Sequence, residues 1–416
     1  MKKILFLVSG GHIPYYTGNG NSVLLFSLLK CFKRLNYNVT VVPICVRSSK
    51  EMYESQKKYL ENYCKIFEDK TLLSPKHYPL LKFSTLKRVL FPKYTDYFFS
   101  KDEVSGLISF YNKNSFDLVY AYDWEAVALF NYFDNKTKLA ASLVDLIDEY
   151  YKLRWKGLFS HSGPINSLLA LVSLIIDRKK PKFAYQALSR SNVIIEHAHQ
   201  HAEKLIYLGF KNVYYIPHPL PIRGFSKGSL KDVVTISIIG SFKGTASQHG
   251  FVFLVEKVLP YLVMNAKEIQ KKYEIRIIGH GAFSDSIRNS LEQYKQCKIV
   301  GFVDDLEGEY AMADIILVTI PMPHGFRTRI AEAFSYGKCV VAHSANAFGM
   351  PEIINGYNAL LAENGYELGK ILIKAINSID LRNEIGLNAI STFDSQLSEE
   401  IGIIKLEKAF SHFDLF

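Results

Sequence analysis

Short apolar runs that end in polar or glycine-rich turns recur along the chain. Ile4–Val8 is continuously apolar and ends at Ser9-Gly10-Gly11, Val23–Leu35 carries apolar residues at helical spacing, and Val39–Ile44 is apolar again. Continuous apolar runs indicate strands that are buried on both faces, as in parallel sheets covered by helices. The pattern therefore predicts a βαβ unit with a glycine loop in its first turn.

The same rhythm continues in both halves of the chain. Further strands are predicted in the first half at Asp117–Tyr122, Leu139–Val144, Val193–Ile195 and Val213–Ile216. In the second half they are predicted at Val233–Ile239, Glu274–Ile278, Cys297–Val300, Ile315–Thr319 and Cys339–His343. Helical pattern separates these strands, so each half reads as a parallel sheet with helices on both faces.

A proline cluster separates the two halves. Proline restricts its own φ and the residue before it, so Pro217-His218-Pro219-Leu220-Pro221 predicts a stiff connector. We predict an acceptor-binding Rossmann-like domain over 1–222 and a nucleotide-sugar-binding one over 223–395. The helical segment 396–416 is expected to pack back on the first domain.

Composition narrows the class of protein. A chain of 416 residues with 48% hydrophobic and 22% charged residues suits two globular domains. Its five cysteines have no CxxC spacing, which indicates reduced thiols and excludes a cysteine zinc site. The longest apolar stretch, 168–176, is shorter than the ~20 residues that span a bilayer. The expected location is cytoplasmic, at most peripheral at the inner face of the plasma membrane.

The net charge of +10 fits an anionic substrate, an anionic membrane surface or nucleic acid. No basic helix with interleaved aromatic residues supports nucleic acid. Two basic segments, 178–182 and 87–94, fit peripheral contact with an anionic membrane or simply a solvated face.

The chemistry is concentrated in one stretch near the C-terminus. Residues 324–333 read His-Gly-Phe-Arg-Thr-Arg-Ile-Ala-Glu-Ala and run into an apolar strand at 339–341. Unpaired backbone N–H groups at a helix start favour a phosphate. The carboxylate of Glu332, further along that helix, is able to accept hydrogen bonds from ribose or sugar hydroxyls.

This stretch resembles the donor-site signature of the group 1, or family 4, retaining glycosyltransferases, which have the GT-B fold. Glu332-Ala333 and Gly337 match that signature, whereas His324 stands where the family usually has a first Glu. The resemblance continues in order through 277–279, 300–303, 310–314 and 350–356. It implies an α/β protein with two Rossmann-like domains that face each other across a cleft.

The resemblance implies a donor site in the second domain, at Gly240, Ser241, Lys243, Phe302, Gly325, Phe326, Arg327, Arg329 and Glu332. Arginine matches phosphate and carboxylate groups bidentately, but Arg327 and Arg329 also fit solvated cations at a helix start. Lys243 is the one cation in a turn where the family often has two. Together with His324, this leaves a CMP-linked sugar acid open as an alternative donor.

On the acceptor side, Gly10, Gly11, His12, Gly18 and Gly20 resemble the family's glycine loop, and they also fit a tight turn that needs positive φ. Tyr120 and Tyr122 replace the family's His-x-His pair. The catalytic candidates are therefore Glu332, His324, Asp123 and Asp145, with Asp148 as a further carboxylate.

The histidines His197, His199, His201 and His218 resemble the ligand set of a metal site. On a helix, spacing of i, i+2 and i+4 places only the outer two on one face, and no carboxylate pattern completes a site. We expect neither a metal nor a cofactor.

The predicted function is transfer of a sugar from a nucleotide-sugar donor to a bacterial surface-glycan, lipid-linked or protein-linked acceptor, with retention. The acceptor class follows from the family alone. Three alternatives stay open: transfer of a sugar acid from a CMP-type donor, epimerisation of a sugar nucleotide, and sugar-nucleotide binding without catalysis.

Overall fold

The computed structural model describes residues 1–11, 13–16, 20–73, 93–149, 171, 175, 178–223, 232–242, 244–281, 283–323 and 325–411. They form two compact units. The first comprises Met1–Ile216 and the C-terminal segment from Gly402, and the second comprises Pro217–Ile401. The division falls at the first residue of the proline cluster.

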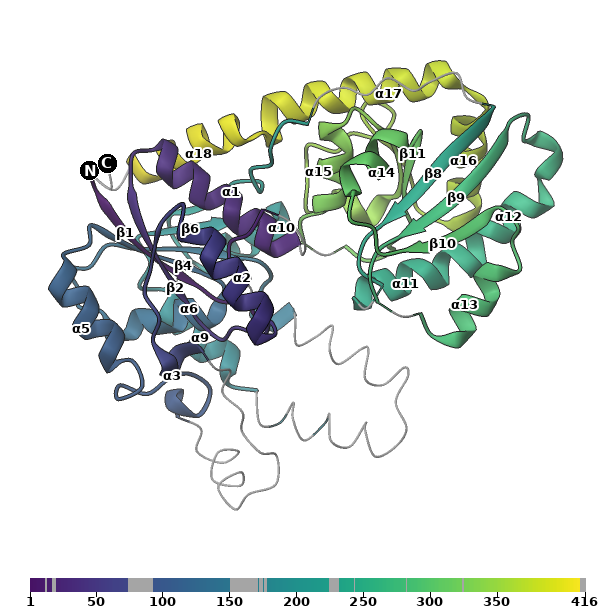
Figure 1. The fold of residues 1–416 in the computed structure, drawn as a ribbon. Coiled ribbons are helices and arrows are strands. Elements are labelled where there is room, and N and C mark those ends of the chain that lie inside the picture. The colour runs from purple at the N-terminus through teal and green to yellow at the C-terminus, as the bar shows by residue number, and fades with distance from the viewer. Residues whose placement is uncertain are drawn as a thin grey trace. The chain divides into compact units, whose positions relative to one another are not determined.

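The first unit is built on a seven-stranded sheet with the order β3-β2-β1-β4-β5-β6-β7 (Figure 1). The strands are β1 (Lys3–Val8), β2 (Asn38–Pro43), β3 (Lys65–Ile66), β4 (Leu118–Tyr122), β5 (Leu139–Leu143), β6 (Val193–Glu196) and β7 (Val213–Tyr215). All of them pair in parallel. Because β1 pairs with both β2 and β4, the strand order reverses between β1 and β4. In open α/β sheets, ligands bind outside the carboxyl ends of the strands at such a reversal.

Alternate residues of β1 explain why its apolar run is continuous. Leu5 and Leu7 belong to one hydrophobic cluster, and Ile4, Phe6 and Val8 belong to another. Successive side chains of a strand point to opposite faces, so both faces of this sheet are covered.

Helices flank this sheet (Figure 1). They are α1 (Gly20–Arg34), α2 (Lys50–Leu60), α3 (Lys70–Leu73), α5 (Ser105–Asn114), α6 (Trp124–Val127), α9 (Lys180–Leu188) and α10 (His199–Tyr207), with short turns η1 (Tyr94–Asp96) and η2 (Ala128–Tyr132). The C-terminal helix α18 (Glu399–Ser411) lies beside α1. Its Phe410 ring lies 6.3 Å from Phe32 and 6.2 Å from Tyr120, so the end of the chain completes the core of the first unit.

The second unit has a six-stranded parallel sheet with the order β10-β9-β8-β11-β12-β13. The strands are β8 (Val233–Ile239), β9 (Lys272–Ile278), β10 (Cys297–Gly301), β11 (Ile315–Val318), β12 (Cys339–His343) and β13 (Leu360–Ala362). Its helices are α11 (Thr245–Phe253), η3 (Leu254–Val258), α12 (Leu259–Met264), η4 (Ala266–Glu268), α13 (Asp285–Glu292), α14 (Leu306–Met312), α15 (Thr328–Ser335), η5 (Ser344–Ala347), α16 (Gly365–Asn377), α17 (Ile379–Thr392) and η6 (Phe393–Leu397). Here the order reverses between β8 and β11.

Every strand predicted from the sequence is present, and β3 and β13 are additional. These two strands have two and three residues, which is too short for an apolar run to stand out. Among the described residues, no helix has both the length and the apolar character to cross a membrane. Of the apolar stretch 168–176, only Leu171 and Ile175 are described, and the basic patch at Lys87 and Arg88 lies outside the described residues.

Candidate active site

In the second unit, Arg329 lies at the point where the strand order reverses. Its guanidinium group packs against the backbone of Gly240, which follows β8: a Cβ atom built on Gly240 would lie 2.8 Å from Nη2 of Arg329. The same Nη2 lies 3.5 Å from Oγ of Ser247. Arg329 has no salt bridge within the described part of the chain, and burial lowers its pKa. Arg329 therefore places a partly buried cation at the carboxyl edge of this sheet, and only the more distant charge of Glu332 acts on it among the described acidic residues.

Glu332 lies one turn further along α15. Its Oε2 accepts a hydrogen bond of 2.9 Å from the hydroxyl of Tyr310, a residue of α14 that is buried and stacks on Tyr336 with ring centroids 5.1 Å apart. Burial raises the pKa of Glu332, whereas the Tyr310 hydroxyl and the charges of Arg223 and Arg329 oppose the rise. Tyr310 thus holds one carboxylate oxygen in place, and no described residue donates to the other.

Arg327 has a different role from Arg329. Its Nη2 donates to the carbonyl oxygen of Met322 at 2.6 Å, and its backbone N–H points at Sδ of Met350 at 3.3 Å. Gly325, with φ of 66°, makes the left-handed turn that brings the chain into α15, a conformation that glycine adopts without strain. Arg327 therefore supports the loop that presents Arg329.

The other residues predicted for the donor site are described by their packing and exposure. The ring of Phe326 packs edge-on against His218 at 5.4 Å. Phe302 is 68% exposed after β10, and Ser241 is partly buried beside Gly240. Lys243 and His324 lie outside the described residues.

In the first unit, the glycine loop packs closely on two side chains at the β1–β4 reversal. Gly10 and Gly11 have φ of 84° and 87°. A Cβ atom on Gly10 would lie 2.8 Å from Oδ2 of Asp123, and one on Gly11 would lie 2.9 Å from Cδ of Arg47. Glycine is required here for both the backbone conformation and the space. Gly20 begins α1, and His12 and Gly18 lie outside the described residues.

Asp123 has a strained backbone and a perturbed carboxyl group. Its φ is 71°, which is rare for a residue with a side chain, and such strain gathers at functional sites. Its Oδ1 accepts the backbone N–H of Trp124 at 2.8 Å. Burial, followed by the charges of Glu125 and Asp145, raises the pKa of Asp123 to about 7, against the opposing N–H of Trp124 and charge of Arg47. The raised pKa of Asp123, at the carboxyl end of β4, is expected of a group that handles protons.

The other site residues predicted in the first unit make different contacts. Asp145 follows β5, and its carbonyl oxygen accepts the indole N–H of Trp124 at 2.7 Å. Asp148 is occupied by the hydroxyl of Tyr185 at 2.6 Å and by Nζ of Lys204 at 2.7 Å. Tyr120, which replaces the first histidine of the family's His-x-His pair, has its ring buried in the core and its hydroxyl bonded to Ser142.

Sequence reasoning missed Glu196. It ends β6, is fully buried, and accepts no hydrogen bond from any described residue. Nδ1 of the buried His201 lies 3.9 Å from its Oε2, and Nε2 of His201 lies 3.3 Å from Glu149. Burial, with the charges of Asp145, Glu149 and Asp123, raises the pKa of Glu196 well above its ordinary value. A glutamate that closes an apolar strand is the sequence signal for this group.

The histidines make separate contacts. Nδ1 of His197 lies 2.8 Å from the carbonyl oxygen of Ile216, and His199 lies 3.6 Å from Glu203. Within the described ranges, no group of histidine, cysteine and acidic side chains is arranged to hold a metal ion.

Part of the chain matches a known protein family. Residues 234–378 match the family model described as "Glycosyl transferases group 1". No curated protein sequence matches the chain significantly.

Solved structures match over 99% of this chain. HepE from Anabaena, in complex with UDP and glucose, is 16% identical with a TM-score of 0.64 over 100% of its chain. Sucrose-phosphate synthase from Thermosynechococcus elongatus is 13% identical with a TM-score of 0.65 over 99% of its chain. TarM from S. aureus, in complex with fondaparinux, alpha-GlcNAc-glycerol and UDP, is 13% identical with a TM-score of 0.64 over 100% of its chain. The second unit therefore contains a region that matches the group 1 glycosyltransferase family model, and the chain has the GT-B fold of these solved structures.

Proposed function

We propose that this enzyme transfers a sugar from a nucleoside diphosphate sugar to a bacterial glycan acceptor, surface-exposed, lipid-linked or protein-linked, with retention at the anomeric carbon. The observation that carries the proposal is Arg329, which has no salt bridge to a described residue and packs beside Gly240, one turn from the oriented carboxylate of Glu332. A diphosphate and a ribose are the two chemical groups that such a pair recognises. HepE and TarM, which share the fold, are both complexed with UDP.

The chemical step needs stabilisation of negative charge more than it needs a strong base. The bond from the anomeric carbon to the phosphate oxygen breaks, a bond to the acceptor oxygen forms, and the acceptor proton passes to the leaving phosphate. Arg329 stabilises the charge that develops on that phosphate, together with the N–H groups at the start of α15. Asp123, in its ionised form, accepts a hydrogen bond from an acceptor hydroxyl and orients it.

The setting proposed for this reaction is the cytoplasm, with the basic segment 178–182 in peripheral contact with an anionic membrane. Such clusters attract anionic lipid by roughly 1 kcal/mol per basic residue. Lys180 of this segment lies over the ring of Phe98 at 5.7 Å. The proposed reaction uses no metal ion.

A panel of nucleotides tests the donor class. We expect one nucleoside diphosphate among UDP, GDP, ADP and TDP to raise the melting temperature by several degrees, because a ligand that binds only the folded state stabilises it. Its sugar conjugates then give a glycosylated acceptor, with unchanged yield in EDTA. A shift from CMP alone would instead select the sugar-acid donor, and donor binding without product would contradict transfer.

Replacing Tyr310 with phenylalanine tests the orientation of Glu332. The variant loses one hydrogen bond to a charged group, so nucleotide affinity is expected to fall roughly tenfold, or about 1.4 kcal/mol. Isothermal titration with the ribonucleotide and its 2′- and 3′-deoxy forms measures this loss. The enzyme should prefer the ribonucleotide, and Tyr310→Phe should weaken that preference. If the deoxy penalty were the same in both proteins, Tyr310 would not act through Glu332.

A further inference from the structure

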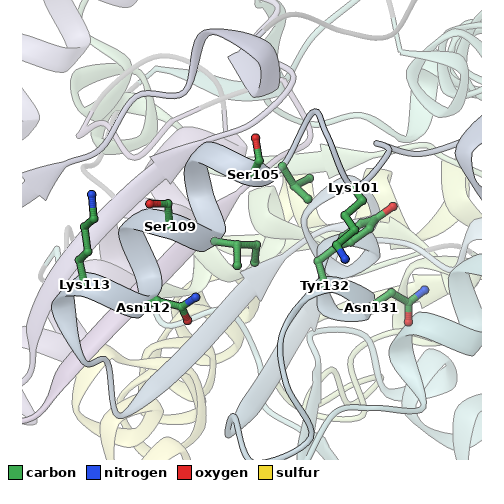
Figure 2. A pocket seen from close by; sticks show the side chains of 9 residues that line it. Lys101, Ser105, Ser109, Asn112, Lys113, Asn131 and Tyr132 are labelled. Carbon is green, nitrogen blue, oxygen red and sulfur yellow. The ribbon is translucent and has the colours of Figure 1, made fainter.

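A pocket of 760 Å³ lies on the first unit, between α5 and η2 (Figure 2). It is lined by Lys101, Val104, Ser105, Ile108, Ser109, Asn112, Lys113, Asn131 and Tyr132. None of these residues belongs to the candidate active site. The volume lies within the range of about 300–1,000 Å³ that is typical of ligand pockets.

One face of α5 supplies most of the lining. Lys101, Ser105, Ser109 and Asn112 recur at intervals of three and four residues, which places them along one side of a helix and the turn before it. Figure 2 shows Lys101 at one end of this row and Lys113 at the other, with Tyr132 and Asn131 at the Lys101 end. A long ligand would meet a cation at each end.

The two lysines have no acidic partner in the part of the chain that the structure describes. The side chains of Ser109 and Asn112 likewise make no hydrogen bond to a described residue. Lys57 and Lys298, by contrast, are paired: Nζ of Lys57 lies 2.6 Å from Glu68, and Nζ of Lys298 lies 2.7 Å from Glu274. The pocket thus combines two uncompensated cations with hydroxyl and amide groups that are available to a ligand.

The floor of the pocket is apolar and fixed in position. Val104 is buried, and Ile108 is partly buried against the core. The half-buried ring of Tyr132 is held by its hydroxyl, which donates to the carbonyl oxygen of Phe99. A rigid aromatic face beside amide and hydroxyl groups is suited to the apolar face and the hydroxyls of a sugar ring. The lysines add the charge that matches a phosphate or carboxylate.

We propose that this pocket is a second glycan-binding subsite, which holds an anionic part of the acceptor chain away from the hydroxyl that reacts. The proposal rests on the proposed function, because it assumes that the acceptor is a glycan. It assigns the pocket to sugars that carry phosphate or carboxylate groups, and it makes acceptor affinity depend on salt.

The double variant Lys101→Ser/Lys113→Ser removes both charges from exposed positions and should fold normally. Lys50→Ser/Lys58→Ser on α2 is the matched control, because it removes the same charge from exposed positions of the same unit outside the pocket. Titration with a hexasaccharide of hexuronic acids and with a neutral hexasaccharide measures binding. We expect the pocket variant to bind the anionic hexasaccharide at least tenfold more weakly, and the control to bind it like the unmodified protein.

Kinetic measurements distinguish a failure of this proposal from a failure of the proposed function. With an anionic acceptor, the pocket variant should show a raised acceptor KM, while kcat and the donor KM stay unchanged. Selective loss of the anionic hexasaccharide supports the subsite even if no donor is turned over, in which case only the proposed function fails. Equal affinity in the two double variants overturns the subsite even if transfer is intact. Loss of binding to phosphatidylglycerol vesicles, with hexasaccharide binding retained, overturns it in favour of a membrane contact.

Discussion

Replacement of Arg329 with methionine is expected to lower kcat/KM for the sugar donor at least 100-fold without destabilising the protein. Removing one donor that stabilises developing charge typically costs about 2.7–4 kcal/mol of transition-state stabilisation. Methionine keeps the aliphatic part of the side chain but removes the guanidinium group that packs against Gly240. Burial disfavours the charged guanidinium, and the loss of its interaction with Glu332 offsets the gain from removing it, so the melting temperature should stay nearly constant. Donor kinetics and thermal unfolding measure the two effects.

Arg276 provides the matched control. Its Nε and Nη2 lie 3.1 Å and 2.7 Å from the two carboxylate oxygens of Glu309, so it belongs to a structural ion pair of the same unit. Arg276→Met leaves a largely buried glutamate unpaired, and it should lower the melting temperature while the folded fraction keeps its kcat. If Arg329→Met kept donor kcat/KM within threefold, or lost stability as Arg276→Met does, Arg329 would not be the phosphate ligand.

Replacement of Asp123 with asparagine is expected to lower the rate of transfer roughly 100-fold. It is also expected to raise the free energy of unfolding at alkaline pH. The pKa of Asp123 rises from 3.8 to about 7 on folding. Between these values the unfolded state binds fewer protons than the folded state, so stability falls as the pH rises from 3.8 to about 7 and is constant above. Asparagine tolerates the φ of 71° and still accepts the N–H of Trp124. The full shift corresponds to about 4 kcal/mol, which solvent exposure of the side chain reduces.

The measurement compares denaturant unfolding of the two proteins at pH 4 and pH 8. Asp123→Asn should be the more stable protein at pH 8, with the advantage gone at pH 4. The exposed Asp134 is the control of opposite sign: hydrogen bonds from Thr137 and Lys136 lower its pKa, so Asp134→Asn should lose stability at pH 8. In the unmodified enzyme, kcat/KM for the acceptor should rise between pH 6 and pH 8. A flat pH profile would contradict a role for the ionised Asp123.

Several assignments depended on contacts that no local pattern contains. Arg327 and Arg329 look equivalent in sequence, but one donates to Met322 at the loop and the other packs against Gly240. Tyr120 occupies a position where the resemblance suggested a polar site group. It points into the core, because alternate residues of a strand share a face and its neighbours on that face are apolar.

The sequence by itself determined the α/β class and the positions of the main strands, and its local motif around Glu332 predicts the donor site. These features are readable because strands buried on both faces must be apolar throughout, and because a helix start and its first turns are contiguous in the chain. Only the tertiary structure decided which groups meet at the two strand-order reversals: Gly240 with Arg329, and Gly10 with Asp123. Such pairs follow from the order in which parallel strands assemble, and that order is a property of the whole sheet rather than of any one segment.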